Sequence, residues 1–249
     1  MIFLLKEPHR AELLFAGWEE TMLYSCLQGV MGNIYVTDPE HPRAACAVLG
    51  DFAFLTGEPE RELLRCPLPP FVIAVPRDPA WQALVVSVYP QAHRVTRYAT
   101  HKNTVFDPDR LRGLASALPL GYTLHRIDAL LYGRCLASPV LADLVSVFGS
   151  RNRFLRDGIG FVVCHEGEVV AGASSYSRYR SGIEVEVDTL PGERRRGLAT
   201  AAAARLILSC TEAGWYPSWD AQNSVSLHLA QKLGYVFSHA YTAFEIRTK

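Results

Sequence analysis

The second half of the chain has hydrophobic positions whose spacing switches between strand-like and helix-like periods. Alternation with a period of two, and short apolar runs between turn residues, predict strands at residues 122–127, 160–164, 169–173, 183–188, 216–221 and 237–246. Spacings of three and four predict helices at residues 138–148, 198–210 and 224–233. The resulting order is strand, helix, hairpin, strand, helix, strand, helix, strand.

Residues at the ends of these segments support the assignment. Ser138 followed by Pro139 is a favourable helix start. Gly214 and Gly234 are favourable helix ends, and residues 165–168 include a glycine suited to a hairpin turn.

The first half of the chain mixes both periods. Helices are expected at residues 12–28, at 80–89 and from Asp107 to near Leu118, and strands at residues 33–37, 44–56, 71–75 and 92–100. Because Leu118-Pro119 ends the last of these helices, we predict two domains. These are an N-terminal α/β domain at residues 1–118 and a second domain at residues 119–249.

Composition narrows the class of protein. The 249 residues are 49% hydrophobic and 20% charged, with a formal net charge of zero, so a nucleic-acid partner, which needs a basic footprint, is not expected. Apolar runs are too short to span a membrane, residues 1–6 are too short for a signal-peptide core, and the six cysteines lack metal-site spacing. We expect a soluble cytoplasmic protein with no membrane partner and no metal.

The segment at residues 183–204 is a strand, a loop and an alanine-rich helix. Backbone N–H groups at the start of such a helix have no helical partner and can bind phosphate or pyrophosphate. Gly197 has no side chain to block the approach, and three arginines precede it. A solvated basic turn is the equally simple alternative.

Two motifs in the second half resemble those of the GNAT superfamily of N-acetyltransferases. One is similar to the signature [QR]-x-x-G-x-[GA] after a T-x-P turn, and the other to the later helix N-x-x-[AS] … K-L-G-[FY]. The matching positions are Thr189, Pro191, Arg194, Gly197, Ala199, Asn223, Ser226, Lys232, Leu233, Gly234 and Tyr235. The resemblance covers residues 120–249 and implies a mixed central sheet flanked by helices, an α/β (α+β) fold.

Within the superfamily, further positions resemble the zwittermicin-resistance type, which carries an N-terminal α/β extension. They are Gly160, Phe161, Thr189, residues 196–200 and residues 217–223. The resemblance implies that acetyl-CoA is the cosubstrate and that an amine attacks its thioester directly. It also implies that the cofactor is held by Val187, Asp188, Thr189, Arg194, Arg195, Arg196, Gly197, Leu198, Ala199, Thr200, Asn223 and Ser226.

An alkyl amine has a pKa near 10, so the reaction needs a base. Strand alternation places Glu184, Glu186 and Asp188 on one face. These acids are either a solvated surface or neighbours in a cleft, where one accepts the proton. The resemblance favours Glu184 as the catalytic base, with Glu186 as the second candidate.

One position departs from the family pattern. The last helix of many GNAT enzymes carries a Tyr that protonates the leaving thiolate, and Ala230 stands there in this chain. Ser226 lies one turn earlier on the same face and is a weak substitute. A thiol also leaves tolerably as the anion, because its pKa is about 8.5.

We therefore predict an acetyl-CoA-dependent N-acetyltransferase acting on a primary amine of a small molecule. The alternatives are a non-catalytic acyl-CoA sensor and an acyltransferase acting on a protein amine. The N-terminal half either shapes the acceptor site or forms a homodimer interface.

Overall fold

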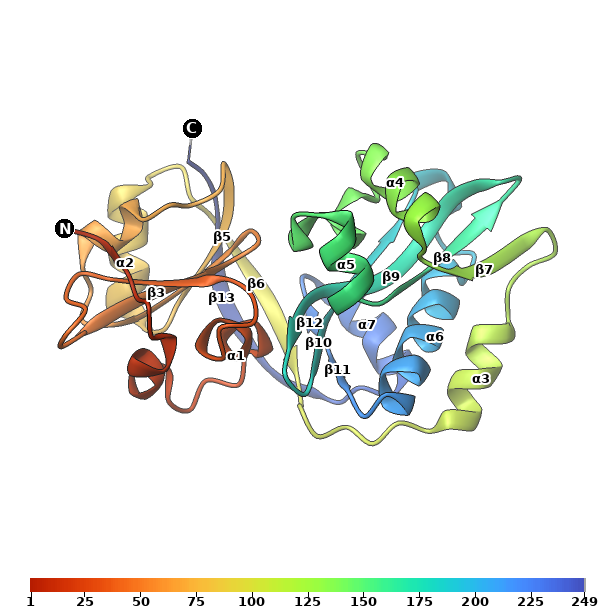
Figure 1. Cartoon of the computed structure of the whole chain (residues 1–249), viewed down its shortest axis with the longest axis horizontal. Helices are drawn as coiled ribbons and strands as arrows, with labels where there is room; N and C mark the ends of the chain where they lie inside the picture. The colour runs from red at the N-terminus through yellow and green to blue at the C-terminus, as the bar shows by residue number, and fades with distance from the viewer. Residues whose placement is uncertain (249) are drawn as a thin grey trace. The chain divides into compact units, whose positions relative to one another are not determined.

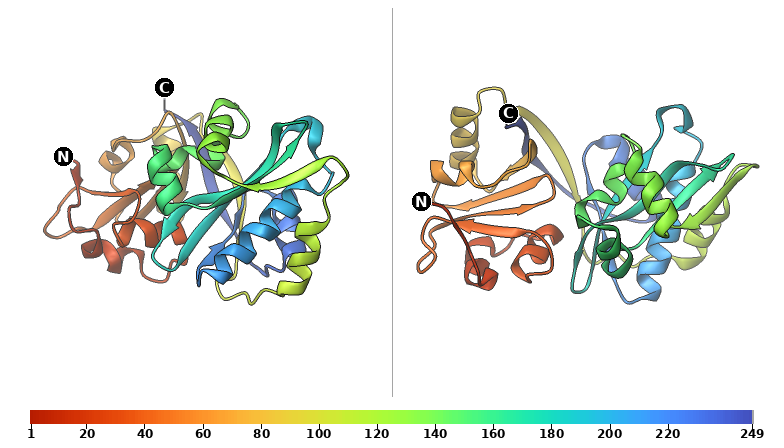
Figure 2. Two further views of the ribbon diagram at one scale, coloured as in Figure 1. Left: turned by 45° about the vertical axis from the view of Figure 1, so that its right-hand side comes forward. Right: turned by 45° about the horizontal axis from the view of Figure 1, so that its top comes forward.

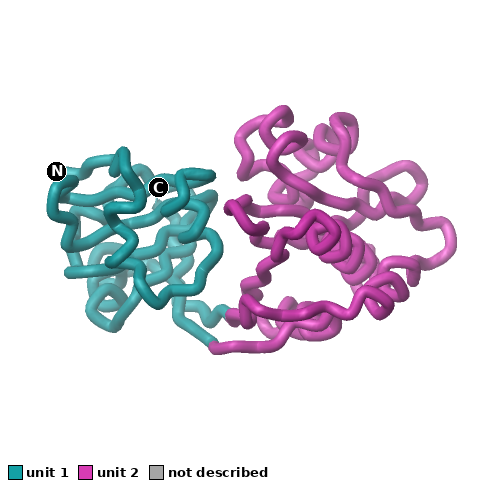
Figure 3. Tube along the Cα trace, turned by 60° about the horizontal axis from the view of Figure 1, so that its bottom comes forward, with its two compact units in different colours: residues 1–97, 240–249 teal, residues 98–239 magenta. Residues whose placement is uncertain are grey.

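The computed structural model describes residues 1–248 and divides into two compact units. The first is Met1–Arg97 with the chain from Ala240 onward, and the second is Tyr98–His239 (Figure 3). The division falls earlier than the boundary expected at residue 118, and the end of the chain returns to the first unit.

The first unit is built on a mixed sheet in the order β1-β2-β3-β4-β5-β13-β6. Strands β2 to β4 are antiparallel, β4 and β5 are parallel, and the end of β13 pairs antiparallel with β5. The strands are β1 (Phe3–Leu4), β2 (Asn33–Val36), β3 (Ala44–Leu49), β4 (Phe52–Gly57), β5 (Phe71–Pro76), β6 (His93–Thr100) and β13 (Phe237–Arg247).

The helices of the first unit are η1 (Pro8–Phe15), α1 (Thr21–Leu27), η2 (Arg61–Arg65) and α2 (Pro79–Val88). Trp81 of α2 and Phe244 of β13 are buried in the same core cluster. The single helix expected at residues 12–28 is wrong: η1 and α1 are separated by Gly17, whose φ of +71° is incompatible with a continuing helix.

The second unit contains a sheet in the order β11-β10-β9-β8-β7. Its strands are β7 (Tyr122–Arg126), β8 (Gly160–His165), β9 (Glu168–Tyr179), β10 (Gly182–Thr189) and β11 (Tyr216–Ser218). The predicted hairpin is confirmed, because β8 and β9 pair across Glu166 and Gly167, both at positive φ. A short strand, β12 (Asp220–Ala221), pairs instead with the end of β6, at Tyr98 and Ala99.

Helices cover both faces of this sheet, which gives the predicted mixed α/β fold (Figures 1 and 2). α6 (Leu198–Glu212) packs on one face, with α3 (Pro108–Ser116) against it, and α7 (Ser224–Leu233) contacts α6 and β12. α4 (Ala129–Ala137), η3 (Ala142–Leu144), η4 (Ser146–Phe148) and α5 (Arg151–Asp157) lie toward the other face. The turn η5 (Pro191–Glu193) leads into α6.

The helix predicted at residues 138–148 is wrong. Ser138 ends α4 rather than starting a helix, and the segment forms only the short turns η3 and η4. Asp128 is the N-cap that the sequence analysis missed, because its carboxylate accepts the N–H groups of Leu130 and Leu131. Leu141 and Leu144 are buried, so side-chain burial sets the conformation here.

The domain boundary moves because α3 belongs to the core of the second unit. Leu111 is 1% exposed and lies in the same cluster as Leu206 and Ile207 of α6. The guanidinium of Arg110 donates to the carbonyl of Lys232 at the end of α7. The second unit thus needs residues that precede position 119.

Truncation of Leu111 tests this boundary. Leu111→Ala should lower the free energy of unfolding by about 2–5 kcal/mol, because it leaves a cavity under α6. The matched control is Leu120→Ala, at a fully exposed leucine, which should change it by less than about 0.5 kcal/mol. Urea titration measures both. If the fragment 119–249 unfolded cooperatively when produced alone, the second unit would not need α3 and the boundary at residue 118 would stand.

Candidate active site

The strands β10 and β11 separate partway along β10. They pair in parallel only from Gly182 to Glu184, opposite Tyr216 to Ser218. Beyond that point β10 stays paired with β9 as far as Thr189, whereas the chain after Ser218 turns to pair with β6. Within residues 1–248, the edge of β10 from Val185 to Thr189 therefore has no neighbouring strand.

A β-bulge marks the same point. Glu184 is opposite Ser177 of β9, and Val185 is opposite Ser175, so Tyr176 is the extra residue. A bulge bends its strand and increases the local twist. The bulge therefore lies beside the point where β10 and β11 separate.

The two faces of β10 differ as the alternation predicted. Ile183, Val185 and Val187 pack against the core cluster that contains α6. The acidic residues lie on the other face, because Ser174, the cross-strand partner of Glu186, donates its hydroxyl to the carbonyl of Leu144 in η3. The acids therefore face the helical turns η3 and η4 rather than α6.

Glu184 is buried, at 3% exposure, so it is not part of a solvated surface. One of its carboxylate oxygens, Oε1, accepts the N–H of Asp220 at 2.8 Å. This bond joins β10 to β12 where the strands separate. A carboxylate held in this way is fixed in orientation, as a proton acceptor requires.

Glu186 is half-buried, and its Oε1 accepts the N–H of Val187 at 3.0 Å. Glu186 thus covers a backbone donor on the strand that the resemblance assigns to cofactor binding. A ligand that needs this donor has to displace the carboxylate.

Asp188 has a perturbed carboxyl group. Burial, with a smaller contribution from the charge of Asp143, raises the pKa of Asp188 to about 6, and Arg194 opposes the shift. Its Oδ2 is buried without a hydrogen-bond partner among the described residues. The ionised form is therefore costly in the folded protein.

The start of α6 forms the open helix terminus that the sequence predicted. Gly197 has a φ of +80° and provides no side-chain cap, and a Cβ there would meet no atom within 4 Å. The N–H groups of the first turn are thus accessible to an anion. Leu198 is buried in the core, so only its backbone can contact an anion. Thr200 is 8% exposed.

Side chains in the loop before α6 hold it in place. Arg194, Arg195 and Arg196 are exposed, and Arg196 pairs with Glu193 at 3.4 Å. Glu193 also accepts the hydroxyl of Tyr122 at 2.6 Å. Among the described residues, Arg194 and Arg195 form no ion pair with Glu193.

The start of α7 places the remaining predicted residues. Asn223 is its N-cap and accepts the N–H of Ser226. The hydroxyl of Ser226 accepts the indole N–H of Trp219 at 3.1 Å. Ala230 is fully buried in the core cluster, so no hydroxyl stands at the position where the family carries its Tyr.

Sequence analysis missed Lys102. This half-buried residue follows β6, and its Nζ donates to the hydroxyl of Ser218 at 3.0 Å. Ser218 is the partner of Glu184 across the last paired position of β10 and β11. No local motif marks Lys102, because 116 positions separate it from Ser218.

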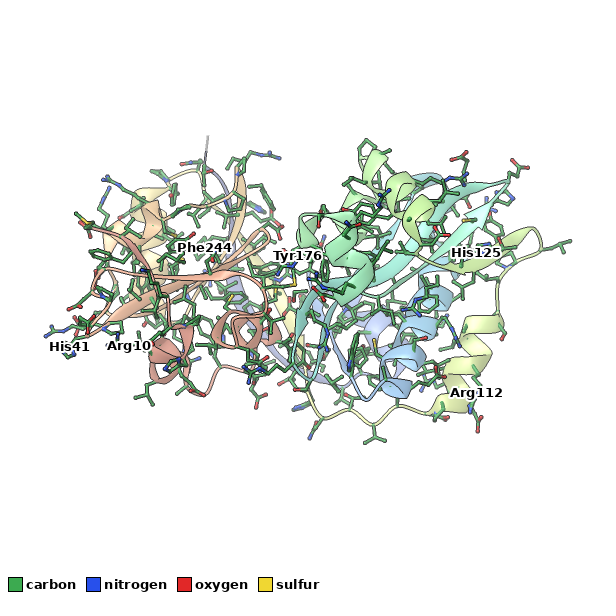
Figure 4. All side chains as sticks on the ribbon, viewed as in Figure 1. Arg10, His41, Arg112, His125, Tyr176 and Phe244 are labelled. Carbon is green, nitrogen blue, oxygen red and sulfur yellow. The ribbon has the colours of Figure 1, made fainter. Side chains whose placement is uncertain are left out.

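A separate hollow of about 420 Å³ lies among β7, α4 and the β8–β9 turn, where Figure 4 labels His125. The nearby start of α4 is already capped by Asp128, so its free N–H groups are used. β7 is also the strand of the sheet farthest from β11. We place the candidate site at β10 and α6.

The described residues give two further findings. Across residues 1–248 no three or more His, Cys, Asp or Glu side chains are grouped to hold a metal ion. None of the described helices is long and apolar enough to cross a membrane.

Comparison with known proteins assigns the family. The model of the GNAT acetyltransferase family matches residues 12–244, so the chain belongs to this family of acetyltransferases. The chain is also similar to a GCN5-related N-acetyltransferase-like protein from Streptococcus suis 89/1591. Its crystal structure is 44% identical with a TM-score of 0.93, and the match covers 97% of this chain and 99% of that one.

More distant similarities agree. An uncharacterized N-acetyltransferase of Bacillus subtilis (strain 168), YdfB, is 35% identical over 129 residues. The match covers 51% of this chain and 49% of that protein, so it spans about half the length of this relative. A tandem GNAT protein from the clavulanic acid biosynthesis pathway shares the fold, with a TM-score of 0.55 at 13% identity over 100% of this chain and 98% of that one.

Substitution of Asp188 tests its burial. The pKa of Asp188 is raised from 3.8 to about 6 in the folded protein. Ionised Asp188 therefore destabilises the folded protein in full above about pH 6, and this destabilisation disappears below pH 3.8, where the carboxyl is protonated in both states. Asp188→Asn should therefore raise the free energy of unfolding at pH 7.5 by about 1–3 kcal/mol and change it little at pH 4. Asp143→Asn, which removes only the smaller cause, should give a smaller gain. Denaturant titrations at both pH values measure this, and a loss at pH 7.5 would contradict it.

Proposed function

We propose that the protein is an N-acetyltransferase of the zwittermicin-resistance type that transfers the acetyl group of acetyl-CoA to a primary amine of a small molecule. The observation that carries the proposal is the open edge of β10 beside the uncapped start of α6, with Glu184 where the strands separate. The subtype rests on the motif residues quoted above.

The residues present fit acetyl-CoA. An extended pantetheine arm can pair with the free edge at Val187, Asp188 and Thr189 as an added strand would. The N–H groups at the start of α6 and the guanidinium groups of Arg194 and Arg195 suit a pyrophosphate. When bound, acetyl-CoA supplies the activated thioester, and the chain supplies orientation and proton transfer.

Asn223 and Ser226 have a smaller role in this proposal than the resemblance implied. The side-chain oxygen of Asn223 already caps α7, and the hydroxyl of Ser226 already accepts a hydrogen bond from Trp219. Asn223 retains its amide N–H groups for the pantetheine arm. Ala230 carries no hydroxyl, so the thiol is proposed to leave as the anion.

Glu184 is the proposed proton acceptor. Its carboxylate is buried and oriented by the N–H of Asp220, whereas Glu186 covers the N–H of Val187. Glu186 and Asp188 share its face and provide negative charge that favours a cationic amine. The acceptor is thus proposed to arrive as an ammonium ion and to lose a proton to Glu184, directly or through water.

A non-catalytic acyl-CoA sensor is the second candidate, because Ala230 provides no acid for the leaving thiolate. The two candidates differ in thiol release. With acetyl-CoA and pooled small primary amines, an enzyme releases CoA at a rate proportional to its concentration, whereas a sensor binds acetyl-CoA without turnover. Added protein in place of the amines tests the protein-amine alternative.

Gly197→Ala tests the cofactor site. A Cβ would enter the open space at the helix start and would also strain the φ of +80°, by about 1–2 kcal/mol. Calorimetry should show CoA affinity reduced by about tenfold or more, or about 1.4 kcal/mol. Gly192→Ala in the same loop, where a Cβ also has space and φ is not positive, should keep wild-type affinity. If the folded wild-type, Gly197→Ala and Gly192→Ala proteins bind CoA with equal affinity, the cofactor site does not lie at the start of α6.

Glutamine substitutions test the base. Glu184→Gln keeps the acceptor for the N–H of Asp220 and removes the basic carboxylate, so turnover should fall by about 10²–10⁴-fold at neutral pH while CoA binding persists. The deficit should shrink as pH rises toward the pKa of the amine. Glu186→Gln is the matched control and should have a much smaller effect. Near-full rates for both variants across pH 6–9 would exclude a base on β10.

A further inference from the structure

Three buried polar side chains form a row across the sheet where the strands separate. Ser177, Glu184 and Ser218 are opposite one another on β9, β10 and β11. Their exposures are 0%, 3% and 0%. Directly opposite residues of paired strands project to the same face, so the two hydroxyl groups flank the carboxylate.

Lys102 brings a positive charge to one end of this row. Its ammonium donates to the hydroxyl of Ser218 at 3.0 Å, and an ammonium group has two further N–H donors. At the other end, the hydroxyl of Ser177 is fully buried and has no hydrogen-bond partner among the described residues. The row therefore has a cation on one side of Glu184 and an unused hydroxyl on the other.

Tyr216 of β11 is influenced by both charges. Burial is the main cause that raises the pKa of its phenol, while Lys102 lowers that pKa and Glu184 raises it. The phenol itself donates to the carbonyl of His101, the residue before Lys102. Both charges thus act on one side chain of β11.

A buried carboxylate needs compensation. Transfer from water into the protein favours the protonated form, and a protonated acid cannot accept a proton from an amine. The backbone N–H of Asp220 is one donor to this carboxylate, which has room for several. A nearby fixed cation favours the ionised form.

We propose that Lys102 is a positioning residue for Glu184: its ammonium, held by Ser218, keeps the buried carboxylate ionised and oriented toward the acceptor amine. The inference rests on the proposed function, in which Glu184 accepts the proton. In this role Lys102 acts through Glu184.

Other titratable groups surround Glu184. Tyr216 and Tyr235 lie near it, but burial raises the pKa of both phenols, so they stay neutral across pH 5–9. Asp220 and Glu186 are acids, and their charges oppose ionisation of Glu184. His101 precedes Lys102 and carries an ionisable imidazole, so it needs its own control.

The direct test is a carbon-13 NMR titration of protein labelled at the glutamate carboxyl carbons, without substrate. The Glu184 signal is identified by its absence in Glu184→Gln. In Lys102→Met its titration midpoint should move upward by about one pH unit or more, and Lys102→Arg should restore most of the shift. Lys6→Met, an exposed lysine of the first unit, and His101→Gln should leave the midpoint unchanged.

The kinetic test uses thiol release with acetyl-CoA and an amine accepted by the wild-type enzyme. The acid limb of the kcat/KM profile should move upward by the same amount in Lys102→Met, with KM for acetyl-CoA unchanged. Ser218→Ala, which removes only the anchor, should move it in the same direction by less. It also serves as the test if Lys102→Met does not fold.

The outcomes separate the two proposals. An unmoved Glu184 midpoint in Lys102→Met, or in Ser218→Ala if the first variant does not fold, overturns the role of Lys102 even when Glu184→Gln is inactive. A moved midpoint together with a fully active Glu184→Gln leaves the electrostatic coupling in place and overturns Glu184 as the base.

Discussion

The separation of β10 from β11 beyond Glu184 is the constraint on which the site depends. A strand has two edges, and each backbone N–H and C=O needs a partner. Once the chain after Ser218 pairs with β6, it can no longer pair with β10, so the edge from Val185 to Thr189 stays available. A β-bulge at Tyr176 of β9 lies at the same point, and α6 starts at Leu198, nine residues beyond Thr189.

The same geometry sets the electrostatics of the acids on β10. Glu184 lies where the strands are still joined, so it is buried but receives the N–H of Asp220. Asp188 lies four residues further along, where its buried oxygen has no partner in the described part of the chain and its pKa is raised. The carboxylates of one strand thus lie in different hydrogen-bonding environments.

Much of the second unit could be predicted because its signals are local. Helix α7 spans Ser224–Leu233 as its periodicity predicted, and it ends before Gly234, the glycine that predicted its end. The alternation along β10 gave the correct faces. Where burial outweighed local preference the predictions were wrong: Ser138 ends a helix instead of starting one, and α3 joins the core of α6.

The sequence by itself determined the order of elements from β8 to α6, the open start of α6 and the shared face of the three acids, because periodicity and glycines act over a few residues. Tertiary structure alone decided which strands pair, that Glu184 is buried rather than solvated, and that Lys102 reaches Ser218. These contacts join segments 36 and 116 positions apart, and pairing over such distances depends on how the whole core packs, which no local pattern records.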